Sequence, residues 1–104
     1  MNYMVLAIKR KNQNHKRKSA RQLERIFKGV ANHRRIEILF AIKNEPGLTL
    51  FSISEQLDCN LKTIAEHVRR LVIAGLVNKN RLNNNTLHEL SPYGKKIVKI
   101  LESF

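Results

Sequence analysis

The segment Asn60-Leu-Lys-Thr-Ile-Ala-Glu-His-Val-Arg-Arg-Leu-Val-Ile-Ala-Gly-Leu-Val77 decides the fold. Apolar residues recur here and just upstream at the spacing of a helix, at Ile53, Leu57, Leu61, Ile64, Val68 and Leu71. Two short helices, Leu50–Leu57 with Thr49 as its cap and about Leu61–Ala74, can therefore bury facing stripes across the turn Asp58-Cys59-Asn60. This pattern predicts a helix-turn-helix.

A β-hairpin is predicted directly after this unit. Gly75 can adopt the left-handed conformation that ends a helix. Two β-compatible runs, Leu76–Leu82 and Thr86–Leu90, follow and are separated by Asn83-Asn84-Asn85. Asparagine tolerates the positive φ that a tight hairpin turn needs. A helix-turn-helix followed at once by a hairpin is the winged-helix arrangement, so we expect a mostly α fold with a small β-hairpin wing.

Two further helices are expected before the helix-turn-helix. Ser19 can cap the first, whose apolar residues are Leu23, Ile26, Phe27 and Val30. Asn32 can cap the second, from His33 to Lys43, with an inner face of Ile36, Leu39 and Phe40. The turn Asn44-Glu45-Pro46-Gly47 is expected to end it. The winged-helix domain should therefore begin at residue 19 and extend to residue 104.

A last helix is expected after the hairpin, because Ser91-Pro92 combines a capping side chain with a proline at the first helical position. Its apolar stripe runs to Phe104. We expect the first and last helices to form a dimer interface, with Leu23, Ile26, Phe27, Ile97, Ile100, Leu101 and Phe104 as its residues. The alternative is that both helices simply complete the core of the monomer.

The charge of the chain favours a polyanionic partner. Its 104 residues, enough for one small domain, include 20 Lys and Arg against 8 Asp and Glu, a net charge of +12. Residues 1–18 form a basic, non-periodic arm that we expect to be mobile without DNA and to contact the DNA backbone. Its candidate phosphate ligands are Lys9, Arg10, Lys11, Lys16, Arg17 and Lys18. A solubilising tail is the alternative.

The second helix of the helix-turn-helix carries the predicted base-reading residues. Because its apolar stripe is turned inward, the opposite side presents Lys62, Thr63 and Glu66 near the start of the helix. Lysine can donate to guanine, threonine can contact the methyl group of thymine, and glutamate can accept from cytosine. Arg69 and Arg70 lie farther along and are expected to hold phosphates. The alternative is a solvated charged face without a partner.

More DNA-backbone contacts are expected from the wing and from the second expected helix. Lys79 and Arg81 alternate along one strand, and Asn84 lies in the uncharged tip. A plain Asn-rich turn is the alternative for the tip. Arg34 and Arg35 start the helix after Asn32, where helix amides and positive charge favour phosphate.

The run Leu23-Glu-Arg-Ile-Phe-Lys-Gly-Val-Ala-Asn-His-Arg-Arg-Ile-Glu-Ile-Leu39 resembles the opening of the ArsR-type winged-helix regulators. The stretch Leu57 to Val77 and the start Ser91-Pro92-Tyr93-Gly94 resemble the same superfamily, so the likeness covers about residues 23–101. The resemblance implies a homodimer that binds a palindromic operator and represses transcription. Many ArsR-type proteins also release DNA when they bind a metal.

The chain departs from the metal-sensing pattern of that family. The family's thiolate site needs a Cys-x-Cys pair on the helix before the turn, whereas Leu50–Leu57 contains no cysteine and Cys59 stands alone. One thiolate cannot supply the three or four ligands of a soft-metal site. His15, His33, His67 and His88 are scattered along the sequence. We therefore expect a binder of double-stranded DNA that needs no metal and no cofactor.

Other functions are less well supported by the sequence. No glycine-rich phosphate loop, nucleophile elbow or metalloprotease motif is present, so we expect no enzyme activity. The sequence offers no transmembrane segment or signal peptide, and the single cysteine suggests a reducing compartment, so we expect a cytoplasmic, nucleoid-associated protein. Nonspecific chromatin-like packaging of DNA, or an RNA- or protein-binding module, are the alternatives.

Overall fold

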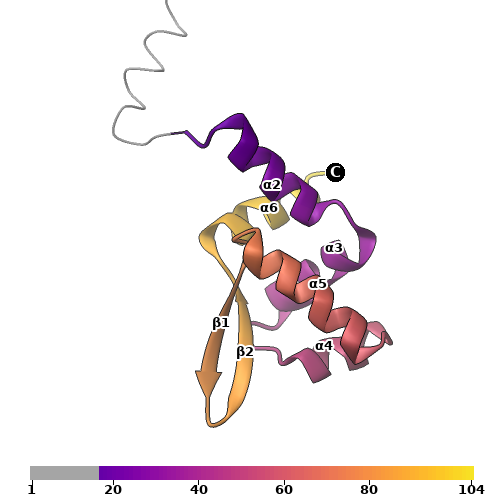
Figure 1. The fold of residues 1–104 in the computed structure, drawn as a ribbon. Helices are drawn as coiled ribbons and strands as arrows, with labels where there is room; N and C mark the ends of the chain where they lie inside the picture. The colour runs from indigo at the N-terminus through magenta and orange to yellow at the C-terminus, as the bar shows by residue number, and fades with distance from the viewer. Residues whose placement is uncertain (1–16) are drawn as a thin grey trace, which may run out of the picture.

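The computed structural model describes residues 17–104, which form five helices and a two-stranded antiparallel hairpin (Figure 1). The elements in chain order are α2 (Ala20–Val30), α3 (His33–Asn44), α4 (Leu50–Leu57), α5 (Leu61–Ile73), β1 (Val77–Leu82), β2 (Asn85–Leu90) and α6 (Pro92–Glu102). The predicted fold class, mostly α with a hairpin wing, is confirmed. No helix formed by residues 17–104 has the length and apolar character needed to cross a bilayer.

A polar side chain caps the start of each of these five helices. Ser19, Asn32, Thr49, Asn60 and Ser91 each accept a hydrogen bond from a backbone amide in the first turn of the following helix. These amides have no partner inside the helix, so the caps fix where each helix begins. The predicted caps Ser19, Asn32, Thr49 and Ser91 are therefore confirmed, whereas Asn60 was expected only as part of the turn before α5.

Helix α3 lies at the centre of the domain and packs against α2, α4, α5, α6 and β2. The prediction for its inner face is partly wrong. Ile38, Leu39 and Ile42 are fully buried, whereas Ile36 and Phe40 are only half-buried. The reason is that neighbours surround α3 on several sides, so its most buried line is set by these neighbours. The helix also extends to Asn44, which was expected to lie in the turn.

The wing ends in a two-residue turn, where the sequence suggested three residues. Asn83 and Asn84 have φ values of 51° and 66°, and Asn85 already pairs with Leu82 in the sheet. Two consecutive residues with positive φ match the twist of a tight hairpin, which asparagine tolerates. The base of the wing is fastened to the domain by His88, a buried side chain whose Nδ1 lies 2.8 Å from the carbonyl oxygen of Leu48.

Candidate nucleic-acid interface

Helix α5 packs with one side against the core. Asp58 adopts a left-handed conformation with a φ of 48° after α4, and the Asn60 side chain caps α5 two residues later. Ile64, Val68 and Leu71 are buried, as predicted. Leu61 was also expected to be buried, but it is 47% exposed because the first turn of α5 projects beyond the core.

The outer side of α5 carries the residues that the sequence placed there. Lys62, Thr63, Glu66, Arg69 and Arg70 are all exposed. The predicted orientation of the helix is therefore confirmed, while the contacts of these residues with DNA stay a prediction.

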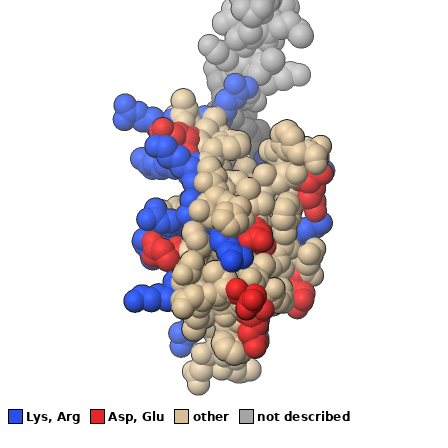
Figure 2. Space-filling view, turned by 90° about the vertical axis from the view of Figure 1, so that its right-hand side faces the viewer, with Lys and Arg blue, Asp and Glu red and all other residues tan. Residues whose placement is uncertain are grey.

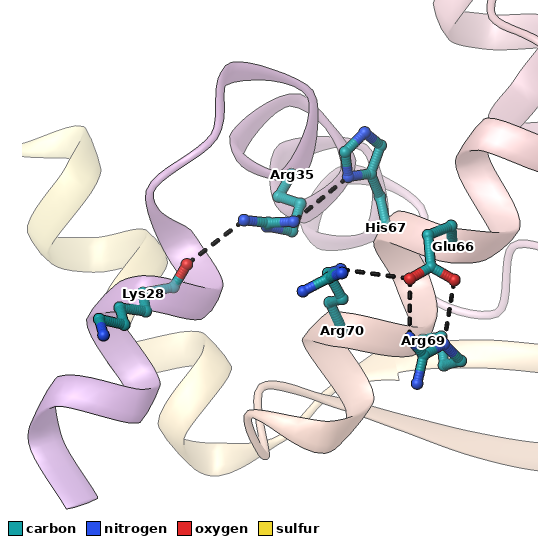
Figure 3. A network of polar contacts seen from close by, with 6 residues as sticks. All are labelled: Lys28, Arg35, Glu66, His67, Arg69 and Arg70. Atoms are coloured by element: carbon teal, nitrogen blue, oxygen red, sulfur yellow. Dashed lines mark hydrogen bonds and ion pairs between the residues drawn. The ribbon is translucent and has the colours of Figure 1, made fainter. Parts of the chain in front are cut away.

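Glu66 is already engaged by two arginines on this outer side (Figure 3). Its Oε1 lies 2.7 Å from Nη2 of Arg69 and 3.2 Å from Nε of Arg70, and its Oε2 accepts from Nε of Arg69 at 3.0 Å. The hydrogen bond from Arg69 is the main cause that lowers the pKa of Glu66 to about 2. The carboxylate is therefore ionised at neutral pH and keeps both guanidinium groups along the same helix face.

The wing brings one of its predicted residues close to α5. Lys79, Arg81 and Asn84 are all exposed. Lys62 and Asn84 line the same open groove, about 700 Å³ in volume, between α4, α5 and the tip of the wing. The exposed Phe51 borders this groove as well. The structure therefore joins a predicted base-reading residue and a predicted backbone contact in a single concave surface.

The two arginines at the start of α3 both make contacts within the domain. Arg34 pairs with Glu37 at 3.2 Å and donates to the carbonyl oxygen of Leu57. Arg35 lies between α2, α3 and α5, where it donates to the carbonyl oxygen of Lys28 and contacts Nδ1 of His67 at 3.4 Å (Figure 3). Both side chains are half-buried because helices α2, α4 and α5 close around this turn of α3. Both side chains are therefore held against the domain, and their contacts with the DNA backbone stay a prediction.

Burial lowers the pKa of His67, and the nearby positive charges of Arg35 and Arg70 lower it further. The imidazole is therefore neutral at pH 7. Burial is the larger cause, and the contribution of Arg35 and Arg70 shows that cationic groups lie near His67 between α2, α3 and α5.

Two basic residues outside the predicted set extend this environment. Arg25 and Lys28 of α2 line a hollow of about 260 Å³ together with Arg35, Arg69 and Arg70. Their spacing of three residues, on the side of α2 away from its apolar stripe, is a signal that the sequence already contained. In Figure 2 most Lys and Arg side chains lie along the left edge, which corresponds to the side of α5 turned toward the viewer in Figure 1.

Of the predicted basic arm, the structure describes Arg17 and Lys18. Lys9, Arg10, Lys11 and Lys16 lie outside the described residues. Arg17 is exposed, and Nζ of Lys18 lies 4.4 Å from the centre of the Tyr93 ring. Lys18 therefore borders a groove between α2 and α6 and does not lie beside α5.

The predicted interface residues of α2 and α6 divide into two groups. Ile26 and Ile97 are 8% and 6% exposed, so they complete the core of the monomer. Leu101 is half-buried. Leu23, Phe27, Ile100 and Phe104 are exposed, and the first three border the same groove of about 490 Å³. The prediction that the helical stripe runs to the last residue is wrong, because α6 ends at Glu102 and Phe104 lies beyond it.

The part of the chain that the structure describes, residues 17–104, contains no group of three His, Cys, Asp or Glu side chains that could hold a metal ion. Cys59 is a free, half-buried thiol in the turn between α4 and α5.

Residues 32–78, which include α3, α4 and α5, match the family described as winged helix-turn-helix DNA-binding. The chain has a winged helix-turn-helix fold. The matched segment contains the capped helix α5 and the turn before it, the elements whose outer surface is described above. No curated relative matches the chain in sequence.

Solved winged-helix structures agree with this assignment. HlyU from Vibrio cholerae is 24% identical, with 81% of this chain and 91% of that chain covered at a TM-score of 0.72. A homodimeric winged helix-turn-helix DNA-binding domain from Mycobacterium bovis, a possible ArsR-family regulator, is 22% identical, with 83% and 85% covered at a TM-score of 0.72. The transcriptional repressor PagR of Bacillus anthracis is 18% identical, with 78% and 93% covered at a TM-score of 0.71.

These likenesses show that the chain has the winged-helix fold. The predicted resemblance to ArsR-type winged-helix proteins is confirmed at this level.

Proposed function

We propose that this winged-helix protein is a sequence-specific regulator of transcription that binds double-stranded DNA as a homodimer and acts as a repressor. The observation that carries the proposal is the outer side of α5. Lys62, Thr63 and Glu66 are exposed on a capped helix whose opposite side is buried in the core. A helix so presented can enter the major groove and read base edges.

The chemistry of these side chains suggests distinct roles in reading bases. Lys62 can donate to guanine acceptors, and Thr63 can contact the methyl group of thymine. A carboxylate has about four acceptor positions, and the guanidinium groups of Arg69 and Arg70 occupy three positions on Glu66. One position remains for the amino group of cytosine. Arg69 and Arg70 can then orient Glu66 and also approach phosphates.

The exposed apolar residues of α2 and α6 support a homodimer. Leu23, Phe27 and Ile100 are 38%, 53% and 47% exposed around one groove. A two-fold arrangement would cover this groove with the same surface of a second copy. The related Mycobacterium bovis domain is described as homodimeric. Such a dimer would present two α5 helices to half-sites about one helical turn apart.

We propose further that this regulator acts in the cytoplasm, at the nucleoid, and without a metal, a cofactor or an enzymatic activity. The support is the residue content of the chain. Cys59 is its only cysteine, and soft-metal sensors need several thiolate or imidazole ligands around one site.

The proposed role as a repressor is supported by PagR, which has the same fold and is described as a transcriptional repressor.

Selection of bound sequences from a random duplex pool tests this proposal. We expect enrichment of a pseudo-palindrome, with the same motif recovered in the presence and absence of added Zn²⁺. A parallel selection from a single-stranded RNA pool should yield no comparable enrichment. Equal retention of all duplexes would instead indicate nonspecific packaging, and preferential retention of RNA would exclude the proposed function.

A further inference from the structure

The hollow between α2 and α5 is lined by five basic side chains, from Arg25, Lys28, Arg35, Arg69 and Arg70, and we refer to it as the cationic hollow. Gly29, Ile73 and Ala74 complete its lining, so no acidic residue lines it. Its volume of about 260 Å³ is small, and its basic residues come from three different helices.

The acidic residues close to the cationic hollow leave it with an excess of positive charge. Glu66 pairs with Arg69 and Arg70, and Glu24 pairs with Lys28 at 3.4 Å. These pairs are exposed to solvent, where water screens them and makes them easy to exchange for another anion. Two carboxylates therefore offset only part of the charge of the five basic side chains.

Arg35 adds a second observation on the inner wall of the cationic hollow. Its Nε atom is buried and has no hydrogen-bond partner, although both terminal nitrogens have contacts. A buried donor without an acceptor is costly, so Arg35, which lines the hollow, keeps an unsatisfied donor in its guanidinium group. The lowered pKa of His67, partly caused by Arg35 and Arg70, agrees with a positive potential here.

The close approach of α2 and α5 places this charge beside the recognition surface. A side chain on Gly29 would have its Cβ 2.6 Å from Cβ of Ala74, so the absence of a side chain permits the contact between the two helices. Leu61 and Ala65 of α5 border the groove on the wing side, whereas Arg70 and Ala74 border the cationic hollow. The wing and the cationic hollow therefore lie on opposite flanks of α5.

We propose that the cationic hollow binds a backbone phosphate of the duplex, on the flank of α5 opposite the wing. This inference rests on the proposed DNA-binding function and adds Arg25 and Lys28 to it as ligands. Arginine forks and lysine ammonium groups are the side chains that bind phosphate oxygens most strongly. Because α2 also carries Leu23 and Phe27 of the proposed dimer interface, the phosphate contacted lies on the side of each half-site that faces the two-fold axis.

The salt dependence of duplex binding measures this contact. The double variant Arg25→Ala/Lys28→Ala should weaken binding to all duplexes, and its plot of log affinity against log salt should flatten. The slope should fall by about 0.9 for each phosphate that the protein no longer neutralises, about 1.8 for a dimer. The matched control Lys95→Ala/Lys99→Ala removes two exposed lysines of α6 that line neither the cationic hollow nor the groove at α5, and it should keep the wild-type slope. Thermal unfolding of both variants checks that they fold.

A scan with single methylphosphonate substitutions identifies the phosphate itself. The wild type should lose severalfold affinity when a neutral linkage replaces a phosphate between the half-sites, and the Arg25→Ala/Lys28→Ala variant should be insensitive to that replacement. The same sensitivity in both proteins would overturn the inference. Titration with inorganic pyrophosphate provides the second arm. Pyrophosphate binding that the double variant abolishes, together with an unchanged duplex slope, would assign the hollow to a free phosphate compound and also overturn the inference.

The two proposals fail in distinguishable ways. If the wild type binds duplex DNA and the double variant has the same slope, the cationic hollow is not a phosphate site and the proposed function stands. If the wild type binds no duplex, both fail.

Discussion

Helices α5 and α2 are both amphipathic and basic, but they use their apolar residues differently. In α5, Ile64, Val68 and Leu71 all enter the core of the domain. In α2, Ile26 is buried while Phe27, one residue later, is 53% exposed. An amphipathic pattern therefore indicates which side of a helix is apolar, but it does not indicate what covers that side.

This difference determines which surfaces of the two helices are available to a ligand. Helix α5 can expose its outer side to a ligand, because Ile64, Val68 and Leu71 on its opposite side are buried in the monomer. Helix α2 has three surfaces, one in the core, one apolar and exposed, and one that carries Arg25 and Lys28. We therefore propose that α5 reads the DNA, whereas α2 makes both the dimer contact and the phosphate contact.

The largest expected effect concerns the buried side of α5. Ile64→Ala should lower the free energy of unfolding by about 2 to 5 kcal/mol, because Ile64 is fully buried and its truncation leaves a cavity. Ile73→Ala, in the same helix but 71% exposed, should change it by less than about 0.5 kcal/mol. Urea denaturation at one fixed protein concentration measures both. Similar losses for the two variants would contradict the orientation of α5.

The exposed side of α2 is tested by a charge in place of an aromatic ring. Phe27→Glu should weaken the proposed dimer by about 2 kcal/mol or more, roughly 30-fold in the dissociation constant, because an interface anchor would become charged. Phe51→Glu is the matched control, since Phe51 is 60% exposed on α4, away from α2 and α6. Sedimentation equilibrium measures the two constants. A dimer that tolerates Phe27→Glu unchanged would exclude this interface.

A base-reading residue and a backbone contact should differ in their effects on specificity. Lys62→Ala should relax base preference at one position of the operator by about 1 to 3 kcal/mol. Lys79→Ala, in the wing, should weaken binding to all sequences about equally. Competition binding with a panel of single-base operator variants measures both. If Lys62→Ala weakened every duplex equally, Lys62 would be a backbone contact only.

The smallest expected effect is the titration of Glu66. Its pKa of about 2 in the folded protein lies below its ordinary value, so any stability it contributes is present above about pH 4.5 and is lost as the pH falls toward 2. Arg69→Gln should raise the pKa of Glu66 toward its ordinary value, because the hydrogen bond from Arg69 is the main cause of the shift. Lys28→Gln should leave it unchanged. Carbon-detected NMR of the carboxyl group follows the titration, and a Glu66 midpoint near 4.5 in the wild type would contradict the ion pairs.

Local signals in the sequence predicted most of the fold. Ser19, Asn32, Thr49 and Ser91 were recognisable as caps because their side chains act on amides only two or three residues away. The outer side of α5 was also predictable, because the spacing of apolar residues within a single helix determines which side is polar. The three-residue wing turn was wrong by one residue, since pairing between Leu82 and Asn85 depends on the register of both strands.

Tertiary contacts explain what the sequence could not predict. From the sequence, Arg35 is expected at an exposed helix start and Ile36 in a buried stripe. Both are half-buried in the structure, and Arg35 contacts residues of α2 and α5 that are distant in the sequence. The cationic hollow is a similar case, because it joins residues of α2, α3 and α5 that lie far apart in the chain. Spacing within one helix could suggest Arg25 and Lys28, but only the packing of three helices brings them to Arg69 and Arg70.

The central claim is that the outer side of α5 faces the duplex. Amide NMR of the labelled full chain, titrated with the selected operator duplex, tests it most directly. The account predicts the largest changes at Lys62, Glu66 and Arg69, with smaller changes at the wing tip and little change at Lys95 and Lys99 of α6. Changes concentrated on the outer side of α6, with the signals of α5 unaffected at saturation, would contradict it.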